Sequence, residues 1–122
     1  MSQYGVLPRS NLFSQFGEDR KLLPTLLAAA GSGPGTFVEL GALDGVHYSN
    51  TMLLDRCFNW TGLLIEPNPT NFNALKRMRR RWPRSAVARH SAVCSSGAPQ
   101  RLNVTVNGGA VAGMPDSATV RK

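Results

Sequence analysis

The stretch that most constrains this chain runs from Thr36 to Asn50 and reads TFVELGALDGVHYSN. It begins with a short apolar run typical of a β-strand, continues through a turn of small residues, and reaches a helix start near Ser49. A backbone without large side chains can approach a ligand closely, and a helix start offers unpaired N–H donors. The stretch therefore predicts a strand, a glycine turn and a helix around a small polar ligand.

The length of the chain, 122 residues, allows one small domain. With 42% hydrophobic and 17% charged residues the composition is globular, whereas the part after Ala98 is richer in Gly, Asn, Ser and Pro. We expect a poorly ordered lead-in over 1–13, a partial α/β domain over 14–106 and a flexible tail over 107–122. A doubly wound sheet usually needs more chain to cover both faces, so we expect the domain to be truncated.

Two helices are predicted on either side of the first strand. In the upstream helix, apolar residues from Leu22 to Ala30 recur at helical spacing, with Asp19 as the N-cap and Gly31 as the stop. Downstream of the glycine turn, Ser49 or Asn50 can cap a second helix. Its inward residues are Met52, Leu53, Leu54, Cys57 and Phe58, and it ends before Asn59.

A second strand is predicted over 62–65, an apolar run of the kind buried on both faces of a parallel sheet. Between Leu40 and Gly62 lie 21 residues, which fits a right-handed crossover through a helix. Glu66 stands at the end of this strand, and Pro67 begins the turn into a third helix. That helix is expected to place Phe72, Leu75, Met78 and Trp82 inward, to place its basic residues outward, and to end at Pro83. Further strands are expected at 86–88 or 90–94, and at 102–106.

The chain carries a formal charge of +7, with many of its basic residues in the run RMRRRW. We favour a solvated helix face over a nucleic-acid surface for this run, because Trp82 alone provides no aromatic platform. Cys57 and Cys94 match neither a metal spacing nor a disulfide framework, and we expect both to be reduced and half-buried. His47 and His90 are expected to be surface or loop residues without a metal. The sequence shows neither a membrane span nor a secretory signal, which predicts a cytoplasmic protein.

Two ligand classes compete for the glycine turn. A dinucleotide site of an NAD-dependent oxidoreductase requires the spacing G-x-G-x-x-G, which Gly41 and Gly45 do not supply. Asp44 would repel a pyrophosphate, but together with Glu39 it suits a ligand that carries an ammonium and a sulfonium. Glu66 is placed to accept hydrogen bonds from a ribose diol. The residues therefore favour S-adenosylmethionine over NAD.

Four separated stretches, SQFGEDRKL, FVELGALDGVHYSNT, NWTGLLIEPNP and NFNALKRMR, resemble the FkbM-type family of S-adenosylmethionine-dependent methyltransferases. The resemblance covers about residues 14 to 97 and occurs in the same order along the chain. It implies an α/β fold with a Rossmann-like class I methyltransferase sheet of parallel strands flanked by helices.

The resemblance also implies a set of cofactor-binding residues. Glu39, Gly41 and the neighbouring backbone at Ala42 would hold the methionine part, and Asp44 and Gly45 would shape the loop. Ser49 and Asn50 match the family's SNT segment and would bond the cofactor or cap the helix. Glu66, with Pro67 beside it, would take the ribose hydroxyls. The adenine would meet the backbone at Ala92, Val93 or Cys94, or else Ser95.

The function expected from the resemblance is methyl transfer from S-adenosylmethionine to a hydroxyl oxygen of an unidentified small-molecule or glycan-like acceptor. No nucleic-acid partner is expected, and no residue stands out as a catalytic base. In-line displacement at a methyl carbon depends mainly on alignment of donor and acceptor. The alternative is a catalytically incomplete remnant or a small basic module that binds an acidic partner.

Overall fold

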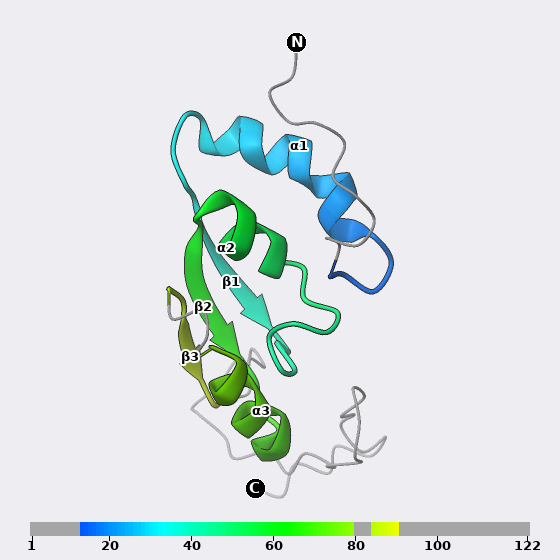
Figure 1. Ribbon diagram of the computed structural model, residues 1–122, viewed down its shortest axis with the longest axis vertical. Helices are drawn as coiled ribbons and strands as arrows, with labels where there is room; N and C mark the ends of the chain where they lie inside the picture. Colours follow the sequence, from blue (N-terminus) through cyan, green and yellow to red (C-terminus); the bar gives the residue numbers. More distant parts are fainter. Residues whose placement is uncertain (1–12, 80–83, 91–122) are drawn as a thin grey trace, which may run out of the picture.

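The computed structural model describes residues 13–79 and 84–90. Along the chain these residues form α1 (Glu18–Ala30), β1 (Thr36–Leu40), α2 (Met52–Phe58), β2 (Thr61–Ile65), α3 (Pro69–Arg79) and β3 (Ala86–Ala88) (Figure 1). This alternation of helices and strands confirms the expected α/β character. The predicted strand at 102–106, most of the one at 90–94, and the tail lie outside the described residues.

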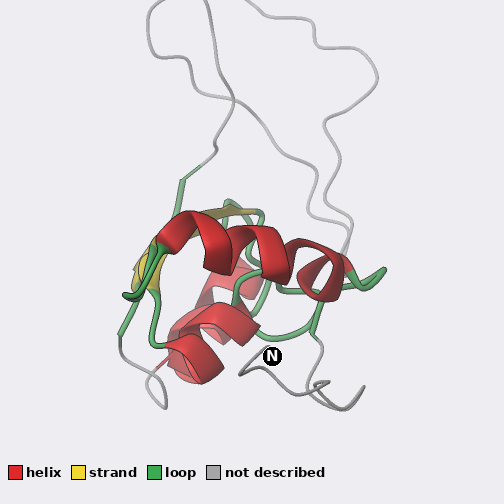
Figure 2. Cartoon of the chain, turned by 90° about the horizontal axis from the view of Figure 1, so that it is seen from above, coloured by secondary structure: helices red, strands yellow, loops and turns green. Residues whose placement is uncertain are grey.

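The three strands form one parallel sheet in the order β1-β2-β3. Val38 of β1 lies beside Leu63 of β2, which in turn lies beside Ala86 of β3. The predicted parallel pairing of the first two strands is therefore confirmed, and β2 is the central strand. Because all three strands run the same way, their carboxyl ends meet at one edge of the sheet. Figure 2 shows the same chain from above, coloured by secondary structure.

One face of the sheet carries the core. Side chains alternate along a strand, so Phe37 and Glu39 share a face with Leu64, which is fully buried. Leu64 packs with Leu75 of α3, and Phe37 packs against a second cluster formed by α1 and α2. The buried members of that second cluster are Leu23, Leu53, Leu54 and Trp60. The described helices therefore cover the same face of the sheet.

The opposite face is open among the described residues. Val38 is 62% exposed and Leu40 is 59% exposed, while Leu63 and Ile65 are half-buried. The prediction that the second strand is buried on both faces is therefore wrong for these residues. The reason is that α1, α2 and α3 all pack on the Phe37–Glu39 side, so none of the described helices covers the other.

Helix α1 ends where the sequence predicts, but it begins at a different N-cap residue. Gly31 is the C-cap, as expected, but the N-cap is Gly17 with a φ of 77°. Asp19 lies inside the first turn, where its carboxylate accepts hydrogen bonds from the backbone N–H groups of Phe13 and Ser14. The N-cap assignment of Asp19 is therefore wrong, because this carboxylate anchors the segment before the helix instead.

Helix α3 confirms part of its predicted face. Leu75 is fully buried and Phe72 is half-buried, while Arg77 is exposed. Arg79, however, is only 4% exposed, so the prediction that the basic residues point outward is wrong for this one. Position 79 is four residues after Leu75 and therefore lies on the same inward side of the helix. Trp82 and Pro83 lie outside the described residues.

Two smaller expectations concern the surface. Cys57 is a free thiol, as expected, but it is exposed rather than half-buried. His47 and His90 are both exposed, as predicted. No helix in the described part of the chain has the length and apolar character needed to cross a membrane.

Candidate functional site

Glu39 on β1 is the acid at the base of the candidate site, and it binds the start of α2. Its Oε2 accepts hydrogen bonds from Ser49 Oγ at 2.8 Å and Thr51 Oγ1 at 2.5 Å, and its Oε1 accepts one from the Asn50 backbone N–H at 2.9 Å. The carboxylate is almost completely buried. Glu39 therefore joins the carboxyl end of β1 to the start of α2, where a negative charge also complements the helix dipole.

Ser49 completes this junction. Its hydroxyl accepts a hydrogen bond from the Met52 N–H at 3.0 Å, in addition to donating to Glu39. Thr51 is the N-cap residue by position, but its side chain makes no capping hydrogen bond. Ser49 thus performs the capping that the sequence predicted for Ser49 or Asn50, although from a position two residues before the N-cap. Asn50 donates a hydrogen bond from its backbone N–H to Glu39, and Asn50 is exposed.

The glycine turn between β1 and α2 crosses over the end of β2. The N–H groups of Gly41 and Ala42 both donate to the carbonyl of Ile65, at 2.9 and 3.1 Å. Gly41 and Gly45 have φ values of 71° and 78°, a region that favours glycine. A Cβ added at Gly41 would meet no heavy atom of the described residues within 4 Å apart from its chain neighbours, whereas one at Gly45 would lie 2.5 Å from Leu75 Cδ1. The turn is therefore open at Gly41 and tightly packed at Gly45.

Glu66 follows β2 and reaches back to the glycine turn. Its Oε2 accepts a hydrogen bond from the Leu43 N–H at 2.8 Å, and its Oε1 accepts one from the Asn68 N–H at 2.8 Å. Asn68 in turn caps α3 by accepting from the Thr70 N–H, with Pro67 half-buried between the two polar residues. Glu39, next to the last residue of β1, and Glu66, directly after β2, are thus brought to one edge of the sheet.

Asp44 lies at the outer side of the turn and pairs with His47. Its Oδ1 accepts hydrogen bonds from the backbone N–H groups of Val46 and His47, and its Oδ2 lies 2.6 Å from His47 Nδ1. Burial raises the pKa of Asp44, but the hydrogen bonds from the His47 ring and from the two backbone groups outweigh it, so the net pKa is lowered. The Asp44 carboxylate is therefore held in place by hydrogen bonds from groups within the protein.

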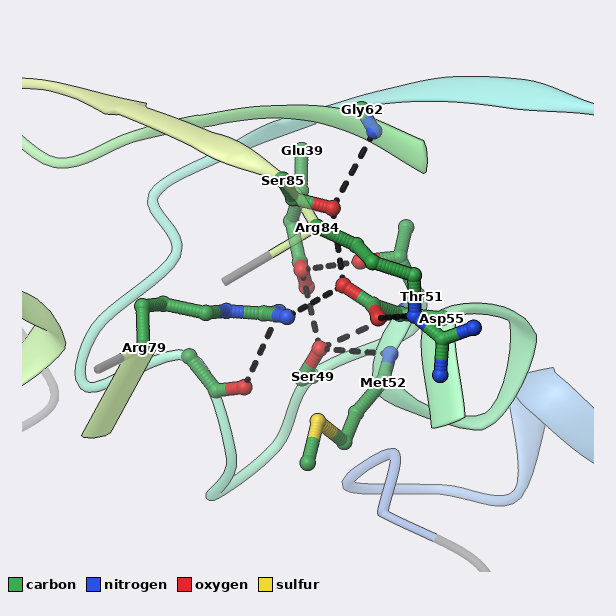
Figure 3. A network of polar contacts seen from close by, with 10 residues as sticks. Glu39, Ser49, Thr51, Met52, Asp55, Gly62, Arg79, Arg84 and Ser85 are labelled. Carbon is green, nitrogen blue, oxygen red and sulfur yellow. Dashed lines mark hydrogen bonds and ion pairs between the residues drawn. The ribbon is translucent and has the colours of Figure 1, made fainter. Parts of the chain in front are cut away.

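Sequence reasoning missed a buried ionic cluster next to the site (Figure 3). The Arg79 guanidinium forms an ion pair with the Asp55 carboxylate, which also accepts a hydrogen bond from Ser85 Oγ at 2.7 Å. Arg79 Nη2 further contacts the carbonyl of Gly45 at 3.4 Å, and Arg84 Nε lies 3.9 Å from Asp55. The cluster ties α2, α3 and the start of β3 to the glycine turn. The sequence could have indicated this cluster, because Arg79 stands four residues after Leu75 and so lies on the inward side of the helix.

The last two predicted contact residues, Ala92 and Val93, lie outside the described residues, as do Cys94 and Ser95. Within the described part of the chain, no group of three or more His, Cys, Asp or Glu side chains is arranged to hold a metal ion. The chemistry available at this edge of the sheet is therefore that of hydrogen-bond acceptors and exposed backbone around Gly41.

Comparison with known proteins found no matching family model, no matching curated protein and no matching solved structure.

Proposed function

We propose that this chain binds S-adenosylmethionine at the carboxyl ends of β1 and β2 and transfers its methyl group to a hydroxyl oxygen of an acceptor. The observation that carries the proposal is the Glu66 carboxylate, which directly follows β2 and accepts a hydrogen bond from the Leu43 N–H of the glycine turn that follows β1. In open parallel sheets, nucleotide-like ligands bind in the crevice beyond the strand carboxyl ends. The resemblance to the FkbM-type family adds the methyl-transfer chemistry.

The hydrogen-bond acceptors of the Glu66 carboxylate fit a ribose diol. Each carboxylate oxygen has accepted one backbone hydrogen bond, and an ionised carboxylate offers about four acceptor sites in all. The remaining lone pairs match the two O–H donors of a vicinal diol. The fixed backbone donors also hold the carboxylate in one orientation before the ligand arrives, which lowers the entropic cost of binding.

The open space at Gly41 supports close approach of the ligand to the backbone. Gly41 is exposed, and among residues 13–79 and 84–90 no heavy atom beyond its chain neighbours lies within 4 Å of the position that a Cβ would take. A side chain there would occupy the volume next to the end of β1. The methionine part of the cofactor is proposed to lie along this backbone, between the ends of the two strands.

The hydrogen bonding of the turn supports a sulfonium ligand over a pyrophosphate. Phosphate-binding glycine loops point unpaired N–H groups at the anion. Here, in contrast, most N–H groups between Gly41 and Asn50 donate to acceptors within the protein, including the Ile65 carbonyl and the Asp44 and Glu39 carboxylates. Within the described residues, a turn with few free N–H donors offers little to an anion, which supports a cationic ligand over a pyrophosphate.

The alternative, a basic binding module, loses part of its support. Arg79 is one of the arginines of the run RMRRRW, and it is buried in an ion pair with Asp55. Lys76 lies over the ring of Phe72, with its Nζ 5.0 Å from the ring centroid. Fewer cations of α3 are therefore free to bind an anionic surface, so we keep this function as an outcome of the test.

Isothermal titration calorimetry of the full chain with S-adenosylmethionine, S-adenosylhomocysteine and NAD tests the proposal. We expect binding of the two adenosyl ligands and no binding of NAD. Glu66→Gln should weaken binding at least about tenfold, because two hydrogen bonds to a charged acceptor contribute about 1.5 kcal/mol or more each. Arg77→Gln on the exposed side of α3 is the matched control and should leave the affinity unchanged.

Circular dichroism of each variant shows whether Glu66→Gln still folds, since its carboxylate also holds the turn. A folded wild-type chain that binds neither adenosyl ligand contradicts the proposal, as does equal affinity in folded Glu66→Gln. Salt-dependent binding to single-stranded nucleic acid without adenosyl-ligand affinity would instead establish the basic module.

A further inference from the structure

The glycine turn carries an imidazole whose inner nitrogen is held by a carboxylate. His47 Nδ1 lies 2.6 Å from Asp44 Oδ2, and the His47 side chain is 73% exposed. When a carboxylate accepts a hydrogen bond from Nδ1–H, the neutral ring keeps its lone pair on Nε2. Nε2 has no hydrogen-bond partner among residues 13–79 and 84–90, so it is available to an external group.

The loop that bears this pair is fixed at both ends. On the β1 side, Ala42 is bonded to the Ile65 carbonyl and Leu43 to Glu66. On the α2 side, Asn50 is bonded to Glu39, and Tyr48 forms a parallel bridge with Ser14. An exposed imidazole on such a constrained loop is a preorganised group, because little further ordering is needed for its nitrogen to meet a substrate.

The pair also lies close in the chain to the proposed ligand position. Asp44 is three residues after Gly41, where the backbone is open, and directly follows Leu43, whose N–H is bound by Glu66. The Asp44 carboxylate accepts hydrogen bonds from backbone N–H groups of the protein. In the proposed complex it therefore does not bind the ligand directly. Its position and partners are those of a residue that orients a neighbouring base.

We propose that His47 is the general base for the methyl acceptor and that Asp44 is its positioning residue. This inference rests on the proposed function and adds to it the base that takes the proton which the acceptor hydroxyl must lose on methylation. A histidine suits this task because a neutral imidazole can accept a proton at one ring nitrogen while the other stays hydrogen-bonded to its partner.

The methyl transfer forms one bond to carbon and breaks another. A lone pair of the acceptor oxygen forms the new bond to the methyl carbon of the sulfonium donor, and the carbon–sulfur bond breaks with its electron pair left on sulfur. His47 Nε2 takes the proton of the hydroxyl, and the carboxylate of Asp44 stabilises the imidazolium that forms. The imidazolium then releases the proton to water, which restores the neutral base.

The test uses diethyl pyrocarbonate, which acylates neutral imidazole nitrogens, with the sites resolved by mass spectrometry. The chain has two histidines, so His90, which is also exposed, is an internal control in every sample. Saturating S-adenosylhomocysteine should slow acylation of His47 at least about fivefold, because a bound ligand of this size covers the neighbouring surface. The rate at His90 should not change.

A second arm addresses Asp44. Asp44→Asn retains a hydrogen-bond acceptor but removes the charge that makes the neutral imidazole more nucleophilic. On the pH-independent plateau of acylation, His47 should therefore react at least about threefold more slowly than in the wild type, while His90 is unaffected. Asp44→Glu restores the charge and should recover part of the rate. A role confined to the turn would lower the melting temperature of both variants without this ranking of rates.

The possible outcomes separate the two proposals. Absence of S-adenosylhomocysteine binding by calorimetry overturns the proposed function and the base with it. Binding that leaves the acylation rate of His47 unchanged overturns the base alone, because the imidazole then lies away from the reacting atoms. Equal His47 rates in the wild type and Asp44→Asn overturn the positioning role of Asp44.

Discussion

At the scale of single residues, Gly41 and Gly45 differ in what surrounds them. Both have positive φ values, so a side chain at either position is strained by about 1 kcal/mol or more. Only Gly45 is packed, because its added Cβ would lie 2.5 Å from Leu75 Cδ1 and 3.2 Å from Arg79 Nε. Substitutions at the two glycines therefore distinguish the cost of backbone strain from the cost of overpacking.

We expect Gly45→Ala to lower the free energy of unfolding by about 2–4 kcal/mol, the sum of strain and overpacking. Gly41→Ala should cost only about 1 kcal/mol, since no atom is displaced, but it should weaken binding of S-adenosylhomocysteine. Urea denaturation measures the first effect and calorimetry the second. Similar unfolding free energies for the two variants would contradict the packing seen at Gly45.

The buried ion pair of Arg79 and Asp55 gives a second prediction. Arg79→Met should destabilise the chain by about 3–5 kcal/mol, because the buried Asp55 carboxylate loses its main compensating charge. Arg77→Met, two positions away on the exposed side, should change stability by about 0.5 kcal/mol or less. Urea denaturation of both variants is the measurement. A small loss in Arg79→Met would show that Arg84 alone compensates Asp55.

At the scale of elements, α1 and the glycine turn are held by aspartates that must be ionised. Burial raises the pKa of Asp19, but hydrogen bonds from the Ser14 hydroxyl and from the backbone of Phe13, Ser14 and Arg20 outweigh it, so the net pKa lies below the ordinary value of 3.8. The pKa of Asp44 is lowered in the same sense. Both carboxylates are therefore better hydrogen-bonded when folded than when unfolded.

The sign of the pH dependence follows from these directions. A group whose pKa is lower in the folded state stabilises it fully above its unfolded pKa, and this contribution disappears as the pH falls through the folded pKa. We expect the free energy of unfolding to decrease below about pH 4, and to decrease less steeply in Asp19→Asn, which is less stable by about 1 kcal/mol at neutral pH. Urea denaturation across this pH range checks it, and an unchanged acid slope would contradict it.

At the scale of the whole molecule, the described sheet is covered on one face. The helices pack on the side of Phe37, Glu39 and Leu64, while Val38 and Leu40 stay exposed. The central strand β2 pairs on both edges, whereas β1 and β3 each pair on one edge within the described residues. Stability is therefore expected to be highest at β2.

Hydrogen exchange provides the measurement. Amides of β2 should exchange more slowly than those of β1, since neighbouring strands bond to β2 on both sides and its own residue Leu64 is fully buried. Equal protection of every amide in β1 would show that its other edge is also paired in the full chain. Leu64→Ala, which removes the centre of this core, should cost about 2–5 kcal/mol.

The local elements could be predicted from the sequence. The glycine-rich loop before Thr36, the apolar runs of β1 and β2, and Gly31 after α1 determine structure through contacts between near neighbours, which periodicity and turn chemistry report directly. The carboxyl-edge position of Glu39 and Glu66 followed from parallel strands alone. These features locate the candidate site.

The partners of each charge were decided only by the tertiary structure. Asp19 reads as an N-cap from its place in the sequence, yet it anchors Phe13 and Ser14, and Arg79 reads as a surface cation, yet it pairs with Asp55 from another helix. Asp44 likewise reads as a ligand contact, although its carboxylate holds His47. A charged side chain pairs with whichever group folding brings within about 4 Å, and that group is often distant in sequence. The sequence alone thus determined the positions of the acids relative to the strands and helices, and the tertiary structure decided which groups they bind.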